Sequence, residues 1–108
     1  MHPAESVLPP IKVRVGEPVV IQLEDNPSTG FNVCLTDMPR GLALAEDTHI
    51  PGQALPGMVG VPGTRRFTFI ALEPGEGNLM FRQVKYTHPQ PTIAEPTPME
   101  NRFVIIEP

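Results

Sequence analysis

Apolar and polar residues alternate along much of the chain, which is the pattern of half-buried β-strands. The alternation is clearest at residues 66–72, where Phe67, Phe69 and Ala71 fall on one face. Further strand-like runs occupy residues 11–15, 19–23, 31–36, 42–45, 78–86 and 101–106. Short strands at this spacing predict an all-β protein, an antiparallel β-sandwich of about seven or eight strands.

Proline and glycine separate these runs. The chain has 15 prolines and 9 glycines among 108 residues, above the ordinary combined level of about 12%. Because proline is disfavoured in helix interiors and central strands, we expect short strands, proline-bearing loops and almost no helix. Residues 49–63 and 87–99 form the longest predicted loops, and we expect the second to be irregular throughout. Long loops in compact domains are often functional.

The length predicts one domain with a core of its own. We expect residues 1–10, with three prolines, to form a flexible leader and residues 11–108 to form the single β-sandwich domain. Cys34 is the only cysteine. An internal disulfide is therefore excluded, and stability must come from the core.

The charge pattern gives no reason to expect nucleic acid as a partner. The formal net charge is -4, and the only adjacent basic residues are Arg65 and Arg66, which we expect to face outward or to lie at an edge. No apolar run reaches membrane-spanning length, so we expect no membrane insertion. We also expect a monomer. Residues 1–10 lack the signal-peptide pattern. The compartment therefore stays open: we expect a cytoplasmic protein, or one exported to the periplasm or outside the cell if a signal peptide precedes this sequence.

The residues that nucleophilic catalysis requires are poorly represented. Ser6 and Ser28 are the only serines, and neither lies in a Gly-x-Ser-x-Gly elbow. Cys34 could pair with His49 or His88 as a nucleophile. Its apolar neighbours within a predicted strand instead favour a buried, inert thiol.

Metal and nucleotide chemistry lack support as well. The three histidines are far apart and do not have zinc-ligand spacing. Residues 57–63 contain several glycines, but no Lys-Ser or Lys-Thr follows them as in a phosphate-binding loop. We therefore expect no enzyme, no metal and no cofactor.

The most informative segment is residues 26–31, Asn-Pro-Ser-Thr-Gly-Phe, between two predicted strands. Pro27 fixes its own φ and keeps the preceding residue out of the helical region. Gly30 can supply a positive φ where the chain turns back. Ser28 and Thr29 are small and polar at the expected tip. Such a stiff loop can enter a narrow cleft at a small ordering cost, although an ordinary tight turn has the same composition.

This segment resembles the Asn-Pro-Thr-Thr-Gly-Phe signature of the chagasin-like inhibitors of papain-family cysteine proteases. Residues 58–64, followed by Phe67, are similar to the family's Gly-x-Gly-Gly loop and the strand after it. Residues 102–106 are similar to its closing strand. The similarity extends from about Ile11 to Glu107.

The resemblance implies an immunoglobulin-like β-sandwich that inhibits such a protease reversibly and tightly, without catalysis. Three loops at one end would straddle the active-site cleft, the first plugging the catalytic centre and the other two gripping its rims. The implied protease-binding residues are Asn26, Pro27, Ser28, Thr29, Gly30 and Phe31 in the first loop, Gly60, Val61, Pro62 and Gly63 in the second, and Lys85, Tyr86 and Thr87 in the third.

The first two loops depart from the family pattern at single positions. Ser28 replaces a threonine and keeps the hydroxyl. Pro62 replaces a glycine, which removes a backbone N–H and restricts φ.

The third loop departs further, because the family carries Arg-Pro-Trp there. The matching residues are 85–87, Lys-Tyr-Thr, or in a shifted register 88–90, His-Pro-Gln, and neither contains tryptophan. Tyr86 can supply a flat anchor, and Lys85 keeps the charge without the forked guanidinium. The missing tryptophan and Pro62 leave an alternative open, a non-inhibitory immunoglobulin-like binding or adhesion module on the same scaffold.

Overall fold

The computed structural model describes residues 8–25, 30–52, 56, 63–94 and 100–108. These residues contain eight strands and no helix, which confirms the expected all-β class. The strands are β1 (Ile11–Arg14), β2 (Pro18–Asp25), β3 (Asn32–Asp37), β4 (Leu42–Ile50), β5 (Gly63–Ala71), β6 (Gly75–Lys85), β7 (Thr92–Ile93) and β8 (Glu100–Glu107).

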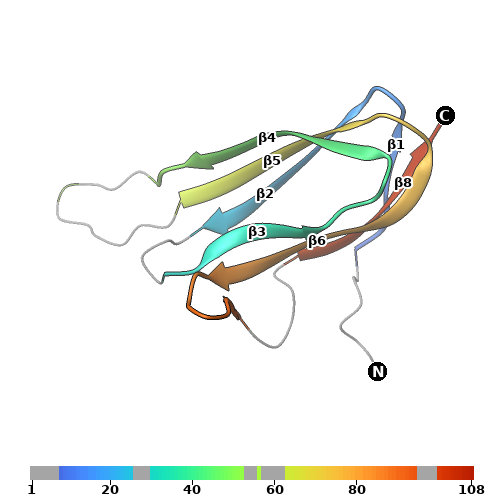
Figure 1. Cartoon of the computed structure of the whole chain (residues 1–108). Coiled ribbons are helices and arrows are strands. Elements are labelled where there is room, and N and C mark those ends of the chain that lie inside the picture. Colours follow the sequence, from blue (N-terminus) through green and yellow to red (C-terminus); the bar gives the residue numbers. More distant parts are fainter. Residues whose placement is uncertain (1–7, 26–29, 53–55, 57–62, 95–99) are drawn as a thin grey trace.

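The strands form two sheets that face each other (Figure 1). One sheet has the order β1-β8-β6-β3, with β7 added beside β6, and the other has the order β2-β5-β4. Every pairing is antiparallel except that of β1 with β8, which is parallel. The first and the last strand of the chain are therefore neighbours.

The core lies between the sheets and is aromatic at its centre. Phe67 and Phe69 of β5 face Phe81 of β6. The ring centroid of Phe81 lies 4.7 Å from that of Phe67 and 6.3 Å from that of Phe69. Leu79 and Val104 are fully buried beside them. Each such side chain contributes about 1.5–3 kcal/mol by leaving water. The alternation seen in the sequence thus places one face of each sheet in a common core.

Strand β4 is longer than the predicted run at residues 42–45. A register shift between Leu44 and Glu46 lets its polar half continue along β5 as far as Ile50, opposite Thr64. Main-chain pairing with β5 does not need apolar side chains, so the hydrophobic pattern missed this half. The loop expected at residues 49–63 is correspondingly shorter.

Two segments expected to be turn or loop contain strands. Strand β6 begins at Gly75, before the predicted run at residues 78–86, because β8 offers main-chain partners there, with Gly75 opposite Ile106. Strand β7 lies within the loop expected to be irregular, with Ile93 opposite Val84 of β6. In both places the neighbouring strand, rather than the local composition, determines the conformation.

The expected leader is described only in part. Residues 1–7 lie outside the described residues. Arg102 donates a hydrogen bond to the carbonyl of Pro9 (2.9 Å), so the end of the predicted leader contacts β8.

Candidate functional site

Three inter-strand segments leave from one end of the sandwich, and this end is the candidate functional site. The first segment is residues 26–31, between β2 and β3, the second is residues 51–62, between β4 and β5, and the third is residues 86–91, between β6 and β7. Asp25, the last residue of β2, lies opposite Gly63, the first residue of β5. Strand β3 begins beside the end of β6, where Asn32 lies opposite Val84. Figure 1 shows the ends of β2, β4 and β6 together, with the C-terminus at the other end of the molecule.

The structure describes six of the thirteen residues expected to bind a protease, and these are Gly30, Phe31, Gly63, Lys85, Tyr86 and Thr87. The others lie outside the described residues, and these are Asn26, Pro27, Ser28, Thr29, Gly60, Val61 and Pro62.

The first and third segments touch at their bases. Gly30 has φ +86°, a conformation that side-chain-bearing residues rarely adopt. A Cβ built on Gly30 would lie 3.1 Å from Cε of Lys85, so the side chain of Lys85 covers this glycine. The Lys85 ammonium also lies 5.8 Å from the centroid of the Phe31 ring, within cation–π range.

The third segment is a hairpin between β6 and β7. Thr87 closes it, because its hydroxyl donates to the carbonyl of Gln90 and lies 2.9 Å from the hydroxyl of Thr92. Lys85 lies opposite Thr92 at the base. The side chain of Thr87 therefore shapes the hairpin from within.

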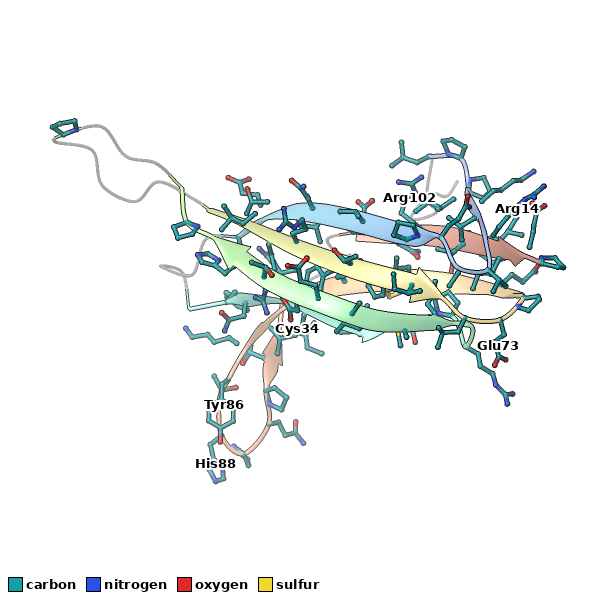
Figure 2. The ribbon with its side chains drawn as sticks, turned by 90° about the horizontal axis from the view of Figure 1, so that it is seen from above. Arg14, Cys34, Glu73, Tyr86, His88 and Arg102 are labelled. Atoms are coloured by element: carbon teal, nitrogen blue, oxygen red, sulfur yellow. The ribbon has the colours of Figure 1, made fainter. Side chains whose placement is uncertain are left out.

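Tyr86 is the most exposed of the large apolar or aromatic side chains described, at 89% exposure. Figure 2 shows Tyr86 and His88 on the hairpin where it projects away from the body of the sandwich. A phenol ring held on a hairpin offers apolar area and a polar tip to a partner at a low entropic cost.

The second segment joins β5 at Gly63, which is buried between two neighbours on β4. A Cβ on Gly63 would lie 2.5 Å from the carbonyl oxygen of Ile50 and 3.0 Å from Cε1 of His49. Glycine is therefore required where the second segment joins the sheet.

Sequence reasoning missed Asp25, the only buried polar or charged residue among those described, at 2% exposure. Its carboxylate lies 2.9 Å from Nδ1 of His49 and 3.8 Å from Nη1 of Arg65. The signal was present in the inward-facing positions of β2, which read Val19, Ile21, Leu23, Asp25. An acid that continues the inward-facing apolar positions of a strand indicates a buried charge.

The expectation for Arg65 was wrong. Two nitrogens of its guanidinium, Nε and Nη2, donate hydrogen bonds to the carboxylate of Asp47, with Nη2 3.0 Å from Oδ2. The guanidinium carbon also lies 5.4 Å from the centroid of the Phe67 ring. The hydrogen bond to Asp47 raises the pKa of Arg65 above its ordinary value. Because side chains alternate along a strand, the two adjacent arginines point to opposite faces of β5. Arg65 lies on the same face as Phe67 and is half-buried.

The described residues contain little that suggests catalysis. Cys34 is half-buried on β3 and is not part of the buried core, which corrects the expectation of a buried thiol. Within the described ranges, no hydrogen bond joins Cys34 to a histidine, and no three His, Cys, Asp or Glu side chains gather as metal ligands. A helix long and apolar enough to cross a membrane is likewise absent from this part of the chain.

Comparisons with known proteins add to this geometry. The family described as Chagasin family peptidase inhibitor I42 matches residues 12–101. The solution structure of amebosin is similar over 90% of this chain and 87% of that one, with 26% identity and a TM-score of 0.61. The crystal structure of the cysteine protease inhibitor EhICP2 from Entamoeba histolytica covers 91% of this chain and 86% of its own, with 19% identity and a TM-score of 0.64. No curated protein matches.

Proposed function

Because the chain belongs to the chagasin family of peptidase inhibitors, we propose that it is a reversible, tight-binding inhibitor of papain-family cysteine proteases. It acts as a monomer and forms a one-to-one complex. The observation that supports this proposal is that the strand ends bounding the three segments lie at one end of the β-sandwich.

In the proposed complex, residues 26–31 enter the active-site cleft as a wedge. Residues 51–63 and the hairpin after β6 contact the two rims. A loop inserted without a peptide bond aligned on the nucleophile resists cleavage, since reaction needs near-attack geometry. The three segments together can bury about 800 Å² on the inhibitor, the usual scale for protease–inhibitor pairs.

Tyr86 is the proposed anchor of the hairpin. Aromatic side chains are frequent hot spots at interfaces, and Tyr86 is 89% exposed before any partner binds. Lys85 has a different role, because its side chain lies over Gly30 and beside Phe31. It supports the first segment from the side and keeps it next to the hairpin.

The proposal is tested by titrating active papain with the purified protein. Activity should fall in proportion to the inhibitor added, reach its minimum near one equivalent, and return on dilution as the complex dissociates. Papain that keeps full activity with the protein in large excess contradicts the proposal.

A second candidate function is a non-inhibitory binding or adhesion module. Pro62 and the absence of tryptophan favour it, because both remove contacts that the family's loops offer. In a pull-down, this function predicts a partner whose binding does not change when residues 26–31 are substituted. Loss of that partner upon such substitutions argues against it.

A further inference from the structure

Asp25 is a charged residue buried beside an apolar core. The buried side chains of the core cluster are apolar, whereas the buried side chain at the end of β2 is that of Asp25, a carboxylate only 3% exposed. Burying a charge costs free energy that an apolar residue at the same position would not incur. The chain accepts this cost at the last residue of β2, where the segment that begins at residue 26 leaves the sheet.

The partners of Asp25 come from the two other strands of its sheet. Nδ1 of His49, on β4, lies 2.9 Å from Oδ2. Nη1 of Arg65, on β5, lies 3.8 Å from the same oxygen. Asp47 orients Arg65 by binding its Nε and Nη2, which leaves Nη1 to face Asp25. One carboxylate thus ties together the ends of β2, β4 and β5.

This cluster is closely packed against the start of β5. Gly63 lies opposite Asp25 in the register, and His49 and Ile50 leave no room for a side chain on it. Asp25 and His49 therefore both lie beside Gly63, the point where the second segment rejoins the sheet.

We propose that Asp25, held by His49 and Arg65, is a positioning residue that fixes the strand ends from which the first and second protease-binding segments leave. Its role is to hold both segments in register with each other before the protease binds. Ordering them in the free protein lowers the entropy lost on binding. The inference rests on the proposed function for its effect on inhibition, but not for its effect on the free protein.

The test uses two variants and two controls in the full chain. Asp25→Asn keeps the size of the side chain and removes its charge, and His49→Asn removes the imidazole from a position 39% exposed. Glu46→Gln is the matched control, because Glu46 of β4 pairs with Arg66 of β5 (3.7 Å) on the outer face of the same sheet. Ile106→Val is the control for a general loss of stability, since Ile106 lies in the core at the opposite end.

The first readout is amide hydrogen exchange of residues 26–31 and 51–62 in the free protein. Loss of a charged hydrogen bond should speed exchange there by about tenfold or more in Asp25→Asn and His49→Asn. Exchange at Val104 should stay close to wild type in the two cluster variants, and exchange of the two segments should stay close to wild type in both controls. Unchanged exchange in the two segments, or an equal rise at Val104, overturns the inference.

The second readout is the inhibition constant for papain, measured well below the melting temperature of each variant. We expect about a tenfold rise in both cluster variants and little change in the controls. Faster exchange without any rise in the inhibition constant overturns the positioning role. If the wild-type protein leaves papain active, the proposed function fails, while the exchange measurement still decides whether Asp25 orders the two segments. If Asp25→Asn does not fold, His49→Asn decides both readouts.

Discussion

At the scale of single residues, Gly30 and Lys85 lie against each other where the first and third segments meet. The positive φ of Gly30 and the lysine side chain over it both disfavour any residue with a Cβ at this position. The sequence predicted the positive φ, because Gly30 ends a turn-forming segment. It could not predict the contact with Lys85, which is 55 positions later, because no local pattern encodes contacts between distant strands.

Substituting Gly30 by alanine should weaken inhibition and lower stability. A residue with a Cβ costs about 1–2 kcal/mol in the left-handed region, and the new Cβ would displace Lys85. Gly16→Ala is the matched control, since Gly16 has φ +94° and nothing within 4 Å of a new Cβ. Thermal melts should show similar losses for both variants, while the inhibition constant for papain rises only for Gly30→Ala. Equal inhibition by the two variants would contradict a role of the Gly30 contact in the site.

Substituting Tyr86 by alanine should weaken papain binding without changing stability. A side chain 89% exposed contributes little to folding, whereas an aromatic hot spot is worth about 2 kcal/mol or more on truncation. Binding kinetics should show faster dissociation, and melting curves should superimpose on those of the wild type. Tyr86→Phe keeps the ring and should bind nearly as well. If Tyr86→Ala bound papain as tightly as the wild type, the hairpin would be excluded as an anchor.

At the scale of elements, where each strand forms and how far it extends depend on the strand it pairs with as much as on its own side chains. The part of β5 within the predicted run at residues 66–72 was predicted best, because Phe67, Phe69 and Ala71 alternate there with less buried residues. The second half of β4 was missed, because its side chains are polar and only its main chain is needed by β5. Strand β7 was missed for the same reason, since two residues beside β6 carry no pattern.

The outer face of β4 and β5 gives a pH-dependent prediction. Hydrogen bonds from Thr48 and Thr68, together with Arg66, hold the pKa of Glu46 below its usual 4.5. A carboxyl group whose pKa is lowered by folding stabilises the protein above its unfolded pKa, and this stabilisation is lost as pH falls through the folded pKa. Glu46→Gln should therefore lower the melting temperature slightly at neutral pH, and the difference should shrink as the pH falls through the folded pKa of Glu46, which lies below 4.5. A difference that grows in acid would contradict this assignment.

At the scale of the whole molecule, the aromatic core and the binding end have separate roles. Phe81 packs between Phe67 and Phe69 and gives the two sheets a common centre. The binding end depends on the sheets only through the strand ends that they bring together. The fold could be predicted from alternation and turn composition, whereas the partners of Asp25 could not be predicted without knowing which strands meet there.

Substituting Phe81 by leucine should therefore separate stability from inhibition. A smaller side chain in the core leaves a cavity and should cost about 1–3 kcal/mol. Urea unfolding should show the loss, while the inhibition constant at a temperature where the variant is fully folded should stay close to wild type. A large loss of inhibition in a folded Phe81→Leu variant would mean that core and site are coupled.

The central claim is that one end of the sandwich, with its three segments, occludes the cleft of a papain-family protease. The structure of the complex with papain tests this claim most directly. We predict that residues 26–31 occupy the active-site cleft, that residues 51–63 and the hairpin bearing Tyr86 contact its two rims, and that the inhibitor chain is uncut. A complex formed through the outer face of a sheet, or through the turns at the opposite end, would contradict it.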